Sequence, residues 1–161
     1  MIKYQSVVLV CKDMQISRTF YQELFDLTIE LEIEGLITFI GGISLWDRAF
    51  ASGLLYKGAG ISEPPERPAQ EIYFDTDEID AFFNKITDRG VKLLHPIEKT
   101  PWQQRTVRFF DPDLNLIEVG ESMEEVIRRV AREGHTPEKV AELTFMPIEI
   151  IRTVLSQEQV K

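Results

Sequence analysis

A carboxylate in the middle of a strand-like segment is the first candidate for chemistry. Glu118 lies in residues 116–119, and Arg108 lies in the similar segment 106–110. Both segments are short and rich in β-branched, aromatic and apolar residues, and the Asp-Pro-Asp sequence at 111–113 favours a turn, so together they predict a β-hairpin. Successive side chains of a strand point to opposite faces, which separates Glu118 from its β-branched neighbours. The Glu118 carboxylate therefore faces either water or a functional cavity.

Histidine and cysteine offer little chemistry in this chain. The two histidines are His95, which precedes a proline at the end of a predicted strand, and His135, which lies in a turn between predicted helices. Neither offers a Ser-His-Asp arrangement. Cys11 is the single cysteine and suits a small apolar core position, so we expect no disulfide framework and no thiolate zinc cluster.

The length and composition indicate one compact domain, or one domain with an extension. The chain has 161 residues, of which 43% are hydrophobic and 28% charged, as in a soluble globular protein. No run approaches the roughly 20 apolar residues that span a bilayer, and the N-terminus has no signal-peptide pattern. The net charge of -9 opposes contacts with phosphates. We therefore expect a cytoplasmic protein with no membrane and no nucleic-acid partner.

The first half of the chain predicts the order β-α-β-β-β. Residues 6–10 predict a buried strand, and Asp13 suits the N-cap of a helix. Residues 28–33 alternate between apolar and acidic side chains, and residues 36–40 and 43–46 flank two glycines as a hairpin. The apolar face of the helix is expected to contain Ile16, Phe20 and Leu24.

The second half repeats this order. Residues 71–74 predict a strand, and Asp77 is expected to start a helix as Asp13 does, 64 residues earlier. Residues 91–95 predict the next strand, which Pro96 ends, and the hairpin already described completes the unit. Two β-α-β-β-β modules are therefore expected, over residues 4–47 and 70–120.

Two stretches lie outside the modules. Residues 47–69 have no sustained periodicity and contain three glycines and three prolines, including Pro64, so they predict a surface linker or a loop that covers a pocket; we expect the linker. Residues 121–161 predict a helical extension, beginning with a capping box at Ser122 and Glu125. Its apolar stripes need a partner surface, either the sheet edge of the domain or a second subunit.

The hairpin residues resemble a known family. Residues 110–113 (Phe-Asp-Pro-Asp) followed by 115–118 (Asn-Leu-Ile-Glu) resemble the closing hairpin of the vicinal oxygen chelate superfamily, which contains glyoxalase I, the bleomycin-resistance proteins and the extradiol dioxygenases. The Pro-Trp sequence at 101–102 is similar to the family segment before this hairpin. Leu114 occupies the usual glycine position, so we expect the turn to differ locally.

The resemblance covers about residues 4–120 and implies an α+β fold. It implies two β-α-β-β-β modules that form a curved eight-stranded mixed sheet around a pocket, with residues 1–120 as the domain and 121–161 as a helical C-terminal tail. Homodimers are common in this family, and a homodimer is expected here.

The resemblance also implies where a metal would be bound. Metal-dependent relatives use four ligands, usually His and Glu, and the matching positions here are Ser6, Ser44, Glu71 and Glu118. Zinc, nickel and iron prefer imidazole ligands, and none of these four positions is a histidine. Two carboxylates could instead hold Mg²⁺ or Mn²⁺, with water as the remaining ligands. Without a metal the two carboxylates would repel, one would keep a proton, and the pair could act as general acid and base. Alternatively, Glu71 lies at a wet pocket mouth and Glu118 pairs with a cation; we expect a metal-free pocket, with Mn, Mg, Ni or Zn as the alternative.

Alternation along the strands adds a ligand-binding wall. It directs Arg108 into the concavity, where it either neutralises Glu118 or grips an anionic ligand by a bidentate fork. Trp46, Tyr73 and Leu116 point inward in the same way, and they either fill the core or line a small-molecule pocket.

The function that these residues favour is binding of a small organic ligand at a degenerate metal site. The first alternative is a glyoxalase-type lyase or isomerase, or a dioxygenase, that uses a divalent metal with Glu71 and Glu118. The second is an interaction protein that uses its helical tail, which resembles a bacterial helix-turn-helix. That tail carries 8 acidic and 6 basic residues, which disfavours DNA.

Overall fold

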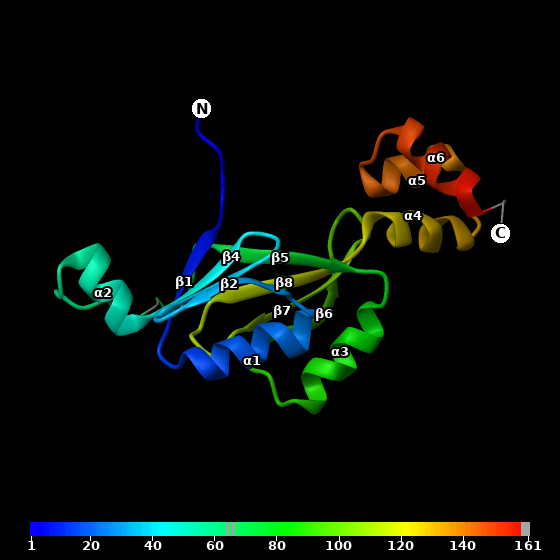
Figure 1. Ribbon diagram of the computed structural model, residues 1–161. Coiled ribbons are helices and arrows are strands. Elements are labelled where there is room, and N and C mark those ends of the chain that lie inside the picture. The colour runs from blue at the N-terminus through cyan, green and yellow to red at the C-terminus, as the bar shows by residue number, and fades with distance from the viewer. Residues whose placement is uncertain (64, 66, 159–161) are drawn as a thin grey trace. The chain divides into compact units, whose positions relative to one another are not determined.

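The computed structural model describes residues 1–63, 65 and 67–158, and it divides into two compact units (Figure 1). Unit 1 contains residues 1–71 and 110–116, and unit 2 contains residues 72–109 and 117–161. The elements are, in chain order, β1 (Val7–Cys11), α1 (Met14–Phe25), β2 (Ile29–Ile33), β3 (Leu36–Phe39), β4 (Ile43–Asp47), α2 (Arg48–Tyr56), β5 (Glu71–Thr76), α3 (Ile79–Asp88), β6 (Leu93–Lys99), β7 (Arg105–Phe110), β8 (Leu116–Glu121), α4 (Met123–Arg132), α5 (Pro137–Thr144) and α6 (Ile148–Glu158).

The repeated β-α-β-β-β order and the α+β class are confirmed. The strands of the described residues form two four-stranded sheets, with the order β1-β4-β3-β2 in the first and β5-β8-β7-β6 in the second. In the first sheet β1 is parallel to β4, while β2, β3 and β4 pair in an antiparallel manner. The first sheet is therefore mixed, as the family resemblance implies, and in the second sheet β6 and β7 are antiparallel.

Helix α1 has the predicted start but a partly different buried face. The Asp13 carboxylate accepts hydrogen bonds from the backbone N–H groups of Gln15 and Ile16, as an N-cap does. Ile16, however, is 55% exposed, whereas Ser17 and Tyr21 are buried. Of the predicted face, Leu24 is buried and Phe20 partly buried, so the prediction is wrong for Ile16. Ser17 and Tyr21 are buried because the turn at 111–113 supplies polar partners for their side chains.

The segment after β4 is not a plain linker. Helix α2 begins directly after Asp47, whose carboxylate accepts hydrogen bonds from the N–H groups of Ala49 and Phe50. Prediction missed this helix because it is short and glycine-containing. Pro64, which belongs to the predicted linker, lies outside the described residues.

Two details of unit 2 differ from expectation. Strand β6 continues through Pro96 to Lys99; it is an edge strand whose register shifts near His95, and proline is tolerated in both settings. Asp77 does not cap α3, which has Glu78 at its N-cap position without a side-chain hydrogen bond. The Asp77 carboxylate instead accepts a hydrogen bond from the hydroxyl of Ser122.

The turn of the closing hairpin keeps a glycine-like conformation. Leu114 has φ of 68°, in the left-handed region that favours glycine. The expected local difference therefore appears as a leucine held in an unfavourable backbone conformation.

The helices of the C-terminal extension provide each other with a partner surface. Helices α4, α5 and α6 lie together in Figure 1 and share a core of Val126, Ile127, Val130, Val140, Ile151 and Val154. Ser122 caps α4 as predicted, and Thr136 caps α5. These apolar side chains are buried among the three helices themselves, without needing the expected contact to a sheet edge or a second subunit. No helix in the described part of the chain is long and apolar enough to cross a membrane.

Candidate functional site

Arg108 and Glu118 form an ion pair between neighbouring strands of unit 2. Arg108 comes from β7 and Glu118 from β8, and an Arg108 guanidinium nitrogen contacts the Glu118 carboxylate directly. The Glu118 side chain is 6% exposed and that of Arg108 is 27% exposed. A buried carboxylate needs a charged partner, and this pair provides one. The arginine meanwhile remains within reach of solvent.

His95 belongs to the same group, a contact that the sequence analysis did not anticipate. It lies opposite Arg108 in the register of β6 and β7, and its Nε2 is 3.4 Å from Arg108 Nη1. Its Nδ1 lies 2.7 Å from the carbonyl oxygen of Pro96. The hairpin alternation located Arg108, but the register shift in β6 that places His95 beside it has no signal in the sequence.

Thr106 is a further residue of this group, and alternation along the strand predicts that it faces the same side as Arg108. It precedes Arg108 by two positions in β7. Its side chain is fully buried, and its hydroxyl has no hydrogen-bond partner among the described residues. Buried hydroxyls normally have a hydrogen-bond partner. The face of β7 that carries Arg108 therefore contains a buried polar atom that could bond to a ligand or to water.

Tyr73 is held by the side chain of Gln104. The Gln104 amide nitrogen donates hydrogen bonds to the Tyr73 hydroxyl (2.8 Å) and to the carbonyl oxygen of Glu121 (2.7 Å). A Cβ at Gly120 would lie 2.6 Å from that nitrogen, so the glycine makes room for the contact. Burial raises the pKa of the Tyr73 hydroxyl above its ordinary value. Tyr73 is therefore a half-exposed, neutral phenol with a fixed orientation.

The serines at the matching metal positions lie together in unit 1. Ser44 donates a hydrogen bond to Ser6 (3.0 Å), and its hydroxyl is 3.1 Å from that of Thr38. Trp46, on the same strand, contacts the ring of Phe50 edge to face with ring centroids 5.6 Å apart. Glu71 is exposed at the start of β5.

These donors do not fit the metal centre that the family would imply. The Ser6 and Ser44 hydroxyls bond to each other and are weak ligands, and a guanidinium beside Glu118 disfavours a second cation there. Over residues 1–63, 65 and 67–158, no group of three or more His, Cys, Asp or Glu side chains is placed to hold a metal ion. The arrangement instead suits recognition of a polar or anionic group.

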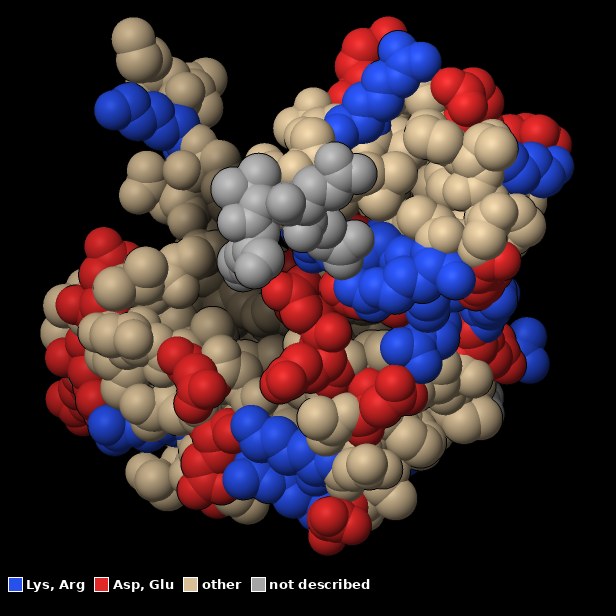
Figure 2. All heavy atoms as spheres, turned by 90° about the vertical axis from the view of Figure 1, so that its right-hand side faces the viewer, with Lys and Arg blue, Asp and Glu red and all other residues tan. Residues whose placement is uncertain are grey.

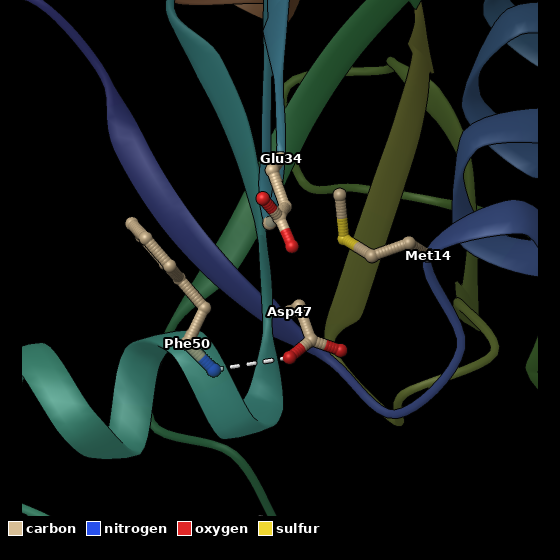
Figure 3. A pocket seen from close by; sticks show the side chains of 5 residues that line it. Met14, Glu34, Asp47 and Phe50 are labelled. Atoms are coloured by element: carbon tan, nitrogen blue, oxygen red, sulfur yellow. Dashed lines mark hydrogen bonds between the residues drawn. The ribbon is translucent and has the colours of Figure 1, made fainter.

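A separate hollow lies in unit 1 beside helix α2. It is a cavity of about 530 Å³ lined by Met14, Glu34, Gly35, Asp47 and Phe50. Figure 3 shows the Asp47 carboxylate turned toward the backbone nitrogen of Phe50, so this acid serves as a helix cap. Gly35, at φ of 77°, allows the Phe50 ring to approach, because a Cβ would lie 2.8 Å from it.

The basic residues of the C-terminal helices are neutralised locally. Figure 2 shows Lys and Arg side chains interspersed with Asp and Glu on this face. Three arginines of α4 form ion pairs, Arg128 with Glu124, Arg129 with Glu121 and Arg132 with Glu125. In the described part of the tail, the arginines of α4 are thus paired with acidic neighbours.

The comparison with protein families identifies the fold family. A model of the glyoxalase-like domain matches residues 4–124. The chain belongs to the glyoxalase-like family. It is thereby a member of the vicinal oxygen chelate superfamily, as the closing hairpin suggested. The match contains all four positions that relatives use for metal ligands, and it ends within α4.

Several solved structures resemble this glyoxalase-like protein. A protein of unknown function from Agrobacterium tumefaciens str. C58 is 29% identical with a TM-score of 0.66, covering 76% of this chain and 95% of that one. A lactoylglutathione lyase from Agrobacterium tumefaciens is 25% identical with a TM-score of 0.55, covering 73% and 92%. A glyoxalase/bleomycin resistance protein/dioxygenase from Nocardioides, 22% identical with a TM-score of 0.61 over 75% and 83%, supports the fold alone. A comparison with curated proteins found no match.

Proposed function

We propose that this glyoxalase-like protein binds a small organic ligand carrying an anionic group, through a metal-free site at Arg108. One observation carries the proposal: the glutamate at the family's metal-ligand position is buried against a guanidinium. That guanidinium lowers the local affinity for a cation and can offer charge-assisted hydrogen bonds to a carboxylate or phosphate. Arg108 is partly exposed, so a ligand can reach it.

The surroundings of Arg108 support selective recognition. Glu118 fixes the guanidinium, and the His95 ring beside it restricts the direction from which a ligand can approach. A group held in advance loses less entropy when it binds. Small-molecule chemistry is also indicated by the name of one relative, a lactoylglutathione lyase.

A ligand screen followed by calorimetry tests the proposal. With a ligand from the screen, Arg108→Ala should weaken binding by roughly tenfold to a hundredfold, since hydrogen bonds to charged groups are worth about 1.5–3 kcal/mol. Arg152→Ala, which removes an exposed arginine of the tail, is the control and should leave affinity unchanged. Unchanged binding in Arg108→Ala would contradict the proposal.

Removing Arg108 alone leaves Glu118 buried without its main partner, so the fold must be checked. The double variant Arg108→Met/Glu118→Leu removes the pair together and avoids an uncompensated buried charge. It should retain the circular dichroism spectrum of the wild type and still fail to bind. If the double variant binds the ligand normally, Arg108 is not the recognition group.

The alternative is a divalent-metal-dependent lyase or isomerase that uses Glu71 and Glu118. Metal analysis by mass spectrometry, followed by titration of Mn²⁺, Ni²⁺ and Zn²⁺ into wild type and Glu118→Gln, separates the two. One metal per chain that is lost in Glu118→Gln would favour the enzyme. The Arg108 contact with Glu118 argues for no specific uptake.

A role of the C-terminal helices in protein interaction is supported by one exposed side chain. Phe145, in the turn between α5 and α6, is 71% exposed and has φ of 58°. If these helices hold the expected homodimer, Phe145→Ser should shift sedimentation toward the monomer. An unaltered sedimentation coefficient would remove them from that role.

A further inference from the structure

Lys12 and Arg48 hold the same carboxylate on the surface of unit 1. The Glu63 carboxylate lies 2.6 Å from Lys12 Nζ and 3.0 Å from Arg48 Nη1. The Glu63 side chain is 64% exposed. The two cations are far apart in the sequence, since Lys12 follows β1 and Arg48 begins α2. Two cations from separate elements thus converge on one oxyanion that the connecting segment supplies.

Arg48 occupies a position where a helix normally disfavours a cation. It is the first residue of α2, and the first turn of this helix contains no acidic residue. The N-terminus of a helix carries a partial positive charge, which a guanidinium opposes and an anion complements. The placement of Arg48 costs helix stability and raises the positive potential at the position of the Glu63 carboxylate. An anion-binding role gives a reason for this cost.

A cavity lies next to the two cations. It has a volume of about 210 Å³, and its lining includes Lys12, Arg48, Ile61, Ser62 and Asp113. The carboxylate of Asp113 does not compete for the cations' side chains, because its oxygens accept hydrogen bonds from the backbone N–H of Lys12 and from Ser17. The cavity therefore has room for the body of a small molecule whose anionic end reaches the cations.

The segment that carries Glu63 is held to α2 by a few hydrogen bonds and ion pairs. Hydrogen bonds tie Gly58 and Gly60 to Ser52 of α2, at 2.9 Å and 3.1 Å. Gly60 has φ of 77°, in the left-handed region that favours glycine, and a Cβ there would meet no atom within 4 Å. Beyond it, the segment is held by Arg48, which donates to the carbonyl oxygen of Ile61, and by the ion pairs of Glu63. Exposed ion pairs contribute little to stability, so Glu63 is a displaceable occupant.

We propose that Lys12 and Arg48 form a binding site for the carboxylate of a small aliphatic acid, and that Glu63 occupies this site until such a ligand displaces it. The side chain of glutamate is chemically a propionate, so the bound group itself indicates the ligand class. Displacement of Glu63 removes the ion pairs that hold residues 61–63 beside Lys12 and Arg48. This site is independent of Arg108 and goes beyond the function proposed above.

Titration of the full ¹⁵N-labelled chain with propionate, followed by NMR, tests the proposal. Glu63→Gln removes the competing charge and should bind propionate about fivefold more tightly than wild type, which corresponds to about 1 kcal/mol. Glu30→Gln, an exposed acid of β2 in the same unit, is the matched control and should bind as wild type does. Equal affinity in wild type and Glu63→Gln would overturn the proposal.

Further variants test the cations and the displacement. In the Glu63→Gln background, Lys12→Gln and Arg48→Gln should each lower propionate affinity at least fivefold. Arg152→Gln, which removes an exposed arginine of the tail, should leave it unchanged. In wild type, propionate should move the amide signals of Ile61 and Ser62 toward their positions in Glu63→Gln. Binding that leaves these signals in place, or that survives loss of both cations, contradicts the proposal.

Inorganic phosphate separates the two sources of an oxyanion. A carboxylate site should bind propionate at least as tightly as phosphate at equal ionic strength. Tight phosphate binding without propionate binding would overturn the assigned ligand class.

Discussion

Asp111 precedes strand β8 and Glu121 is its last residue; both carboxylates are buried, but their partners differ in kind. Asp111, in unit 1, accepts hydrogen bonds from the hydroxyl of Tyr21 and from the side chain and backbone of Asn115, all neutral groups. Glu121, in unit 2, is held by the guanidinium groups of Arg129 and Arg105. The hairpin thus contains an acid held by neutral hydrogen bonds in its turn and an acid held by ion pairs at the end of its second strand.

The two environments move the pKa in opposite directions. Burial raises the pKa of Asp111 above its ordinary value, although the hydrogen bonds from Asn115 and Tyr21 act against it. Burial also acts to raise the pKa of Glu121, but the hydrogen bond and charge of Arg129 and the charge of Arg105 outweigh it and lower the pKa. Neutral donors only partly replace water around a carboxylate, whereas two cations more than replace it.

The difference assigns distinct tasks to the two acids. Asp111 and its neighbour Asp113 attach the hairpin turn to α1 of unit 1 through Tyr21 and Ser17. Glu121 attaches α4 to β7 in unit 2, and Arg129 adds a hydrogen bond to the carbonyl oxygen of Gln103. Ion pairs at α4 thereby fix the C-terminal helices to the sheet of unit 2.

The largest expected effect comes from removing Arg129. Arg129→Met leaves Glu121 buried with one cation instead of two, and we expect a loss of about 3 kcal/mol in the free energy of unfolding, measured by urea denaturation. Arg132→Met is the matched control, because Arg132 is 58% exposed and its pair with Glu125 should contribute less than about 1 kcal/mol. Equal losses in the two variants would show that the Glu121 pair behaves as a surface pair.

The contributions of Glu121 and Asp111 to the free energy of unfolding should change in opposite directions as the pH falls. Glu121 has a lowered pKa in the folded state, so its stabilisation is complete above its ordinary pKa of 4.5 and is lost as the pH falls through the folded value. Asp111 has a raised pKa, so stability is lost as the pH rises from its ordinary 3.8 through the folded value. Each unit of pKa difference corresponds to about 1.4 kcal/mol.

Urea midpoints measured from pH 3 to 7 check this difference. Glu121→Gln should flatten the loss of stability on the acid side, and Asp111→Asn should steepen the rise of stability with pH by removing the opposing contribution. If both variants change the pH profile in the same direction, the two environments do not differ as described.

Local signals predicted the elements, and long-range contacts decided the rest. Asp13 and Ser122 cap helices by accepting hydrogen bonds from residues two or three positions later. These helix starts could therefore be predicted from the local sequence. The buried face of α1 depends on partners of Ser17 and Tyr21 that lie about 90 residues later. No pattern in the helix itself contains this information.

The candidate site shows the same limit. Alternation in β7 and β8 was enough to place Arg108 toward Glu118, because adjacent antiparallel strands leave few choices. It could not place His95, which reaches Arg108 only after a register shift in an edge strand that contains proline. Glu63 was missed because an exposed acid in a glycine-rich segment looks like any other linker residue.

The smallest expected effect sharpens the description of Asp111. Leu114, in the turn that Asp111 organises, has φ of 68°, which costs a residue with a Cβ roughly 1–2 kcal/mol, while glycine loses roughly 0.5–1 kcal/mol in chain entropy. Leu114→Gly should therefore raise the free energy of unfolding by about 0.5 kcal/mol. Leu114→Ala keeps the Cβ and the strain, so it should give no gain. If alanine stabilises as much as glycine, the leucine is not strained, and the Asp111 hydrogen bonds hold a turn that is already relaxed.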